Sequence, residues 1–406
     1  MLMFKRLRAL RTNENILIAS DVLLSSKSSF MNVFLMAHMI NVSLESSPIN
    51  FVIYSIVRYA AMGVLAVLLL NFYRRHKLAA WRASMVFSLL EIAAIMLLDS
   101  TAFYYPYVLA ILSSMEASMY WRPKVFFDVS EVEETHLLRF RGTTTILTEI
   151  VKIVMPAVLG FVIGINGYTN AAYVVLAISA MQLLLSLCFH PSNRSSITSS
   201  HSWSKIFAII QKHESLQKLL CFAFVRGLVI CSSAYLVISQ IELYRSVNSE
   251  LDLGLFTSLS AIIAIVLVMI YRRLKNQRQQ KAMLLTFLPA VILLPLALII
   301  YPNNATLAIT LYVFMQGVVG GLFDGTITMT RLHGVLGTHL HDSSYRLEVE
   351  CLVEVALSIG RTIGFAALLF FIVMGWEQYI MWIALVVSLL VIPWYKMALP
   401  KKHRYN

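Results

Sequence analysis

Five charged side chains interrupt stretches of the chain that are otherwise apolar, and their chemistry suits them to binding protons or polar groups. Asp21 and Lys27 lie in the first such stretch, Arg58 in the second, Glu116 in the fourth and Arg226 in the seventh. A charge at the centre of a bilayer costs about 2.5–3.5 kcal/mol, so it normally faces a wet cavity or a partner. If the stretches cross a membrane, these five residues are candidates for binding a substrate or protons.

Glu116 is the candidate proton acceptor, because small residues surround it and an apolar site disfavours a charged carboxylate. Lys27 lies in a polar run, residues 25–29, and we expect it either to bind an anionic group or to neutralise Glu116. Lys27 and Asp21 are six residues apart, so they lie on different faces of a helix and are not expected to pair. Asp21 is a candidate gate. The alternative for each of the three is a purely structural role.

Arg58 and Arg226 remain charged at every physiological pH, and a guanidinium can hold a carboxylate or phosphate through two parallel hydrogen bonds. Each is therefore a candidate ligand for an anionic substrate, and Arg226 is also a candidate inner gate. The alternative is that each side chain extends to the membrane interface, where its charge is solvated.

Two further pairs of opposite charge share a helical face. Glu149 and Lys152 are three residues apart, and Glu354 and Arg361 are seven apart. Local neutralisation is the simplest interpretation. Glu149 and Glu354 also occupy equivalent places in a weak internal repeat, so both pairs are candidates for gating contacts between two halves of the molecule.

The composition is that of a membrane protein. The 406 residues are 59% hydrophobic and 13% charged, with a mean hydropathy of +0.74, whereas a soluble domain carries about a quarter charged residues. We predict twelve apolar spans, each of a length that crosses a bilayer as a helix. They cover residues 15–42, 50–71, 83–98, 105–120, 143–164, 170–189, 219–241, 253–271, 282–300, 305–323, 348–374 and 379–395.

Of the 33 Lys and Arg, 28 lie outside these spans; 27 of the 28 fall in alternate connections, and Arg245 is the one that falls on the opposite side. Because positive loops stay on the cytoplasmic side, both termini are predicted to be cytoplasmic and the protein to lie in the cell membrane. Anionic lipid rather than nucleic acid then accounts for the net charge of +12. The connection 121–142 is expected to be a solvated loop with a short helix.

No motif for bond-breaking chemistry is present. The sequence lacks a P-loop, G-x-S-x-G and H-E-x-x-H. The four cysteines make no C-x-x-C pair, and no Cys/His cluster has the spacing of a zinc site. We therefore expect a protein that is not an enzyme, with no catalytic residue, no metal and no cofactor.

The spans divide into an N-terminal half, residues 1–189, and a C-terminal half, residues 218–406. The connection 190–217 begins with a Ser-rich run typical of a flexible linker, and residues 203–210 resemble an amphipathic interfacial helix. Both halves begin on the cytoplasmic side, so the sequence predicts two parallel six-helix halves.

This organisation resembles the major facilitator superfamily over essentially the whole chain. The basic connection after the second span, residues 71–77, keeps the basic residues of that family's signature but lacks its Gly and Asp. Pro156, Gly160 and Gly164 resemble the Pro- and Gly-rich fifth helix of exporters. The resemblance implies that the first, fourth, seventh and tenth spans line a cavity, whereas the third, which carries Glu91, faces lipid.

The resemblance also implies a secondary active transporter that works by alternating access. Buried carboxylates favour coupling to protons, as an antiporter that exports a small amphiphilic or anionic molecule. Two alternatives stay open: a lipid flippase of the same fold, and a non-transporting membrane partner or sensor whose charges pair internally. The expected partners are the lipid bilayer, a small-molecule or lipid substrate and protons, and the expected state is a monomer.

Overall fold

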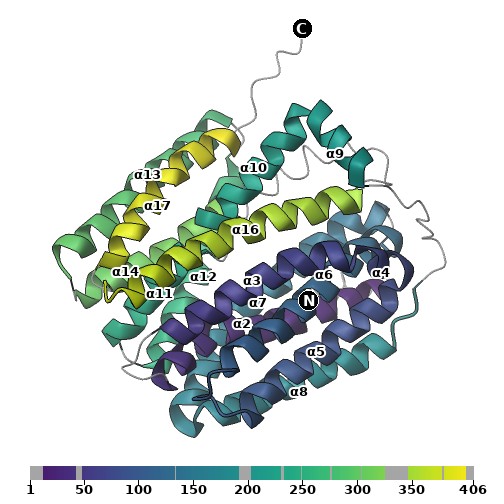
Figure 1. Cartoon of the computed structure of the whole chain (residues 1–406), viewed down its shortest axis with the longest axis horizontal. Helices are drawn as coiled ribbons and strands as arrows, with labels where there is room; N and C mark the ends of the chain where they lie inside the picture. Colours follow the sequence, from purple (N-terminus) through teal and green to yellow (C-terminus); the bar gives the residue numbers. More distant parts are fainter. Residues whose placement is uncertain are drawn as a thin grey trace. The chain divides into compact units, whose positions relative to one another are not determined.

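The residues that the computed structural model describes lie mainly in helices and contain no β-strand (Figure 1). An all-α chain is therefore confirmed over the described part. The N-terminal basic residues, residues 192–202 of the predicted linker and the C-terminal tail lie outside it. The structure describes residues 12–42, 48–132, 134–191, 203–229, 233–247, 249–274, 277–302, 304–324, 346–376 and 379–398.

The helices coincide with the predicted spans. Within the described part of the chain, eight helical segments are long and apolar enough to cross a membrane. The protein is therefore a multi-pass membrane protein. The remaining four predicted spans also fall on helices, but a total of twelve spans remains a prediction. The eight segments are residues 49–68, 77–97, 142–166, 168–187, 214–247, 250–271, 282–300 and 348–373.

The helices group into two compact units. Unit 1 contains residues 1–54, 68–199 and 250–258, and unit 2 contains residues 55–67, 200–249 and 259–406. Two helices, α3 (Ile49–Leu68) and α12 (Glu250–Arg273), are divided between the units. The predicted halves, 1–189 and 218–406, remain a prediction.

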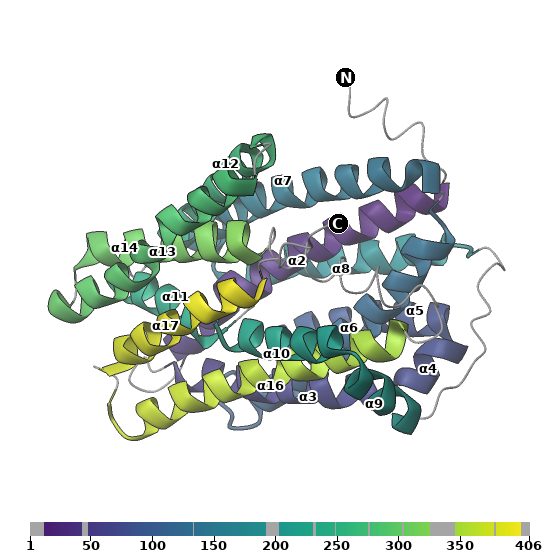
Figure 2. The ribbon, with the colours of Figure 1, turned by 90° about the horizontal axis from the view of Figure 1, so that it is seen from above.

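Unit 1 holds most of the buried charges. Its α2 packs against α7 and α8, and its α5 packs against α6 and α8. The pairing of α5 with α8 is visible in Figure 1, and that of α2 with α7 in Figure 2. The helices are α2 (Thr12–Val42), α4 (Leu70–Arg75), α5 (Lys77–Leu97), α6 (Tyr105–Ser130), α7 (Glu134–Asn166) and α8 (Tyr168–Leu187).

The expectation of a solvated loop at 121–142 is wrong. Helix α6 continues through Ser130, and α7 begins at Glu134. The reason is that this part of α6 has a buried face, on which Phe127 and the side chain of Lys124 are almost fully inaccessible. Counting charges alone cannot separate a solvated loop from a helix that buries one charged stripe.

An aromatic cluster fixes one end of unit 1. The rings of Trp81 from α5, Phe127 from α6 and Phe189 meet edge to face, with centroids 5.0–5.7 Å apart. Beside them, the guanidinium of Arg82 donates hydrogen bonds to the carbonyl oxygens of Ser186 and Phe189. A cation at this position complements the carbonyl groups at and just after the C-terminal end of α8. These contacts set the rotation of α5 and α6, which carry acids one to three turns further along.

Close backbone approaches hold other helices in unit 1. A Cβ atom on Gly254 would lie 2.4 Å from the carbonyl oxygen of Pro156, and Gly160 lies against the same part of α12. Only glycine allows this approach without moving the backbone. Gly160, expected from sequence to belong to an exporter-like helix, therefore has a packing role here.

Unit 2 is also built from closely packed helices. Helix α10 lies along α16. The approach requires glycine on both helices, since a Cβ on Gly227 or on Gly360 would fall 2.1 Å from a carbonyl oxygen of the other helix. The predicted interfacial segment is helical, as α9. The helices are α9 (Trp203–Lys212), α10 (Glu214–Val229), α11 (Ala234–Val247), α13 (Gln277–Ile300), α14 (Ala305–Phe314), the π-helical η2 (Met315–Asp324), α16 (Arg346–Val373) and α17 (Ile380–Ala398).

Candidate functional site

A buried triad of charges, Lys27, Glu91 and Glu116, joins three helices of unit 1. The Lys27 ammonium on α2 forms an ion pair with Oε2 of Glu91 on α5, and it lies 2.5 Å from Oε2 of Glu116 on α6. The three residues are 1%, 0% and 7% exposed. The predicted neutralisation of Glu116 by Lys27 is therefore present, and Glu91 is a partner that the sequence analysis did not identify.

Three serines close to the triad residues in sequence bond to the backbone of their own helices. The hydroxyl groups of Ser26 and Ser29 donate to carbonyl oxygens one turn earlier in α2, and that of Ser114 does the same in α6. These small side chains allow the helices to approach while their own hydrogen bonds are satisfied internally.

The triad has one more negative than positive charge when both acids are ionised. Lys27 contacts one oxygen of each carboxylate, and the other oxygen, Oε1, of Glu91 and of Glu116 is buried without a hydrogen-bond partner among the described residues. A buried polar group without a partner costs about 1–3 kcal/mol, and more when it is charged. One additional proton would neutralise the set and give one of these oxygens a hydrogen to donate.

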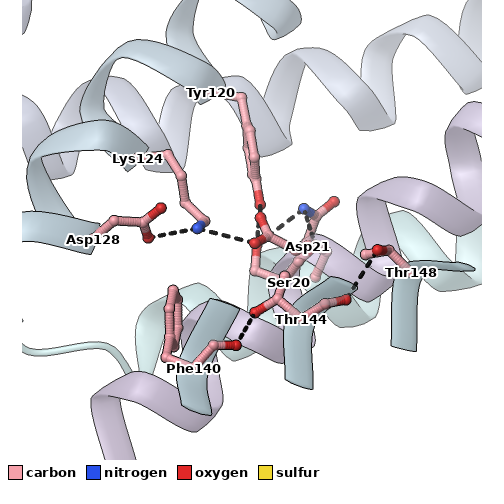
Figure 3. A network of polar contacts seen from close by, with 9 residues as sticks. Ser20, Asp21, Tyr120, Lys124, Asp128, Phe140, Thr144 and Thr148 are labelled. Carbon is pink, nitrogen blue, oxygen red and sulfur yellow. Dashed lines mark hydrogen bonds and ion pairs between the residues drawn. The ribbon is translucent and has the colours of Figure 1, made fainter. Parts of the chain in front are cut away.

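A second buried network, which we call the Asp21 network, surrounds Asp21 (Figure 3). The Lys124 ammonium lies 2.9 Å from Oδ2 of Asp21 and 2.6 Å from Oδ1 of Asp128. The hydroxyl of Tyr120 donates to Oδ1 of Asp21 over 2.7 Å. Asp21 and Lys27 therefore have separate partners, as their spacing along α2 predicted.

The Asp21 network extends to a third helix through Ser20. The Ser20 hydroxyl lies 3.1 Å from that of Tyr120, and Gln182 of α8 donates from Nε2 to the hydroxyl and the carbonyl oxygen of Ser20, both over 3.1 Å. The neighbouring hydroxyls of α7, on Thr144 and Thr148, donate instead to carbonyl oxygens of their own helix, as Figure 3 shows. Asp21 is thus held by α6, with α8 fixing the residue beside it.

The remaining candidates from the sequence lie elsewhere. Arg58 and Arg226 are half-buried and belong to unit 2. The guanidinium of Arg58 lies 5.6 Å from the centre of the Tyr59 ring, a cation–π distance. Their predicted role in binding substrate remains a prediction.

The two same-helix pairs form as expected. Lys152 and Glu149 are 2.6 Å apart on α7, with side chains 53% and 28% exposed. Arg361 and Glu354 are 3.4 Å apart on α16, and the Arg361 guanidinium also lies 4.8 Å from the centre of the Tyr59 ring. Local neutralisation is therefore present in both, whereas their predicted role in gating remains a prediction.

The lipid-facing position expected for Glu91 from the family resemblance is wrong, because this acid is fully buried. The sequence did carry a signal, since Glu91 is a charge in an apolar span and such charges seek partners. A second missed signal is the spacing of Glu116, Tyr120, Lys124 and Asp128, which places them on one face of a helix.

Other candidate sites in the described part of the chain are weaker. Among these residues, no group of three or more His, Cys, Asp or Glu is placed to hold a metal ion. A hollow of about 400 Å³ is lined by four aromatic side chains at the ends of α16 and α17. Aromatic rings at such positions are typical membrane-interface anchors. The lining residues are Phe371, Trp376, Tyr379 and Trp382.

No family model and no curated protein sequence matches the chain significantly. Solved structures do match its fold. A mutant of the nucleoside transporter NupG is 13% identical, with a TM-score of 0.67 over 95% of this chain and 100% of that one. The POT family transporter PepTSo is 9% identical, with a TM-score of 0.67 over 95% and 98%. A bacterial homologue of the iron transporter ferroportin, in an inward-facing state, is 12% identical, with a TM-score of 0.67 over 95% and 98%.

Identities this low establish the fold and nothing finer, and the likeness extends over nearly the whole length of every chain compared. Together with the apolar helices described above, it shows that this chain has the fold of these solved transporter structures, as the resemblance seen in the sequence implied.

Proposed function

We propose that this protein is a secondary active transporter that exports a small amphiphilic or anionic molecule in exchange for protons, by alternating access. The observation that carries the proposal is the buried triad, in which one lysine serves two acids. Structures of the same fold that are named as transporters of nucleosides and of iron support the general class.

In the proposed cycle the triad stores one proton. Glu116 takes up the proton from the outer side, and this neutralises the net negative charge of the triad. Protonation weakens the Lys27–Glu116 ion pair, which ties α2 to α6, while the Lys27–Glu91 pair remains. The proton therefore changes which helices are held together, and differential stability of this kind biases a two-state equilibrium.

The rest of the proposal concerns topology and the path of the substrate. Both termini are cytoplasmic, the protein acts as a monomer in the cell membrane, and the two six-helix halves rock about a central site. Arg58 and Arg226 hold the anionic group of the substrate. The pairs Glu149–Lys152 and Glu354–Arg361 break and re-form as gates.

The test is proton flux in everted vesicles, with the wild type compared with Glu116→Gln and with the control Glu214→Gln. Glu214 also pairs with a lysine, but its side chain is 77% exposed. Amphiphilic drugs, organic anions and lysolipids are added in turn while the internal pH is recorded. We expect a compound-triggered proton movement that is lost in Glu116→Gln, because an amide at this position cannot take up the proton, and that is unchanged in the control.

A second candidate function is that of a non-transporting membrane partner or sensor. The observation in its favour is that Lys27 and Asp21 each pair inside unit 1. In that case no compound, lysolipids included, triggers proton movement, although the protein is inserted and folded. A Glu116→Gln variant that moves protons at the wild-type rate, with the same pH dependence, would also exclude the proposed role of Glu116.

A further inference from the structure

Helix α16 of unit 2 has a polar face that carries a guanidinium and two hydroxyl groups. Arg361 and Thr362 follow Ser358 by three and four residues, and residues at these spacings are neighbours on a helix surface. Arg361 and Ser358 are 7% and 1% exposed. Ser358 faces α3, since a Cβ on Gly63 would lie 3.1 Å from the Cβ of Ser358. Hydrogen-bond donors gathered in this way are suited to holding an anion.

The two hydroxyl groups differ from those of other helices in the chain. Serine and threonine hydroxyls in α2, α6, α7 and α12 donate to the carbonyl oxygen four residues earlier. Oγ of Ser358 and Oγ1 of Thr362 are buried and have no hydrogen-bond partner among the described residues. Because a buried hydroxyl without a partner is destabilising, a group that accepts hydrogen bonds from these two would be held favourably.

Glu354 is an ion-pair partner of Arg361 on the same helix. Nη1 of Arg361 lies 3.4 Å from Oε1 of Glu354, whereas charge-assisted N–H···O bonds are about 2.7–2.9 Å long. The side chains of Arg361 and Glu354 are 8% and 22% exposed. Glu354 can therefore leave the guanidinium without becoming fully buried. Arg361 cannot be left without an anion, because a buried charge that loses its partner is strongly destabilising.

An aromatic ring of α3 lies against this face. Tyr59 stacks on Phe365 of α16, with ring centroids 5.7 Å apart. The Arg361 guanidinium lies 4.8 Å from the centre of the Tyr59 ring, and that of Arg58 lies 5.6 Å from the same centre. Two guanidinium groups, one from each helix, are thus placed beside one ring, and both favour an anion there.

We infer that Arg361, Ser358 and Thr362 bind the carboxylate group of the substrate, in competition with Glu354. The inference deepens the proposed function and rests on it, because it names organic carboxylates as the exported class. A carboxylate is the anion favoured here, since it replaces the carboxylate of Glu354 by a group of the same shape and charge. The planar guanidinium can hold it through two parallel hydrogen bonds.

This exchange of anions gives the proposed Glu354–Arg361 gate a reason to open. While Glu354 holds the guanidinium, the pair stays closed. An arriving carboxylate releases Glu354 and keeps the charge of Arg361 balanced, and no covalent bond or proton is involved. The substrate therefore binds better to the state in which the pair is broken, and a difference of this kind shifts a two-state equilibrium.

The competing explanation is a structural role, in which Arg361 only holds α16 against Tyr59 of α3. The two explanations differ in the effect of removing the Glu354 charge. If Glu354 competes with the substrate, Glu354→Gln raises the affinity for carboxylates. If the pair is structural, Glu354→Gln lowers the stability and leaves that affinity unchanged.

The experiment is calorimetric titration of the purified full chain with acetate, benzoate and hexanoate, each compared with the amide of the same acid. We expect a carboxylate to bind more tightly than its amide. Glu354→Gln should bind it about threefold more tightly or better, and Arg361→Gln about tenfold more weakly or worse, since hydrogen bonds to charged groups contribute factors of this order. Ser358→Ala should weaken binding by a smaller factor. The control Glu214→Gln removes an acid from an exposed pair and should bind as the wild type does.

The double variant Glu354→Gln, Arg361→Gln serves in case Arg361→Gln alone does not fold, because it leaves neither charge without a partner. We expect the same loss of binding. Equal affinities in the wild type, Glu354→Gln and the double variant would overturn the inference, and so would the absence of any carboxylate that binds better than its amide. The proposed function would still stand if another compound triggered proton movement in the vesicles. Carboxylates that bind through Arg361 but trigger no proton movement would refute transport of this class and leave only a binding site.

Discussion

The triad and the Glu149–Lys152 pair use the same chemistry in two different settings. The triad joins residues 64 and 89 positions apart in the chain and is almost completely buried. The Glu149–Lys152 pair spans three positions on one helix and is partly exposed. Burial strengthens the attraction between charges but also makes an unpaired charge costly, whereas water screens an exposed pair. The same type of contact is therefore expected to matter greatly in one place and hardly at all in the other.

The largest effect is expected for Lys27→Met. This change leaves two buried carboxylates without their cation, and removing one partner of a buried pair costs about 3–5 kcal/mol. The unfolding free energy, measured by denaturant titration of the purified protein, should fall by this amount. If the loss were below about 1 kcal/mol, the comparison between buried and exposed charges would not hold.

A matched control separates charge from packing at the same position. The triple variant Lys27→Met, Glu91→Gln and Glu116→Gln contains no charge in the triad. We expect it to recover most of the lost stability, because replacing all members of a buried ionic group is often neutral. A triple variant as unstable as Lys27→Met alone would show that the lysine stem, rather than its charge, holds these helices.

An intermediate effect is expected for Lys124→Met in the Asp21 network. Lys124 also serves two acids, but one of them, Asp128, is partly exposed and can be solvated when the lysine is lost. The expected loss of unfolding free energy is on the order of 2 kcal/mol. Asp128→Asn is the control and should cost less than about 1 kcal/mol, and a larger cost would place Asp128 in the same class as Asp21.

The smallest effect is expected for Lys152→Met. Exposed pairs three or four residues apart on a helix contribute about 0.2–0.5 kcal/mol. Thermal melting of Lys152→Met should be close to that of the wild type and to that of Lys218→Met, which removes another exposed partner of a glutamate. A fall in melting temperature as large as that of Lys124→Met would mean that this pair is buried in the working protein, as its candidate role as a gate would require.

The residues of the two buried networks show how much of the candidate site could be predicted from the sequence. Glu116 and Lys27 were recognised because a charge in an apolar span is rare, and their pairing was one of the two roles expected for Lys27. Glu91 carried the same signal, but its span was assigned to lipid by resemblance, and the assignment was wrong for this residue. Lys124 and Asp128 were missed because the fourth predicted span ended at Tyr120, although α6 continues through both.

The sequence by itself determined an all-helical membrane protein, the location of the apolar spans and the pairs three to seven residues apart, because hydropathy and helical periodicity are local properties of the chain. The tertiary structure alone decided that one lysine meets two acids from two other helices, and that Asp21 meets Tyr120 and Lys124. Periodicity fixes which residues share a face of one helix, but the direction of that face depends on how the helix is rotated against its neighbours. That rotation is set by contacts such as Trp81 against Phe127 and Phe189, which arise only when distant segments pack together.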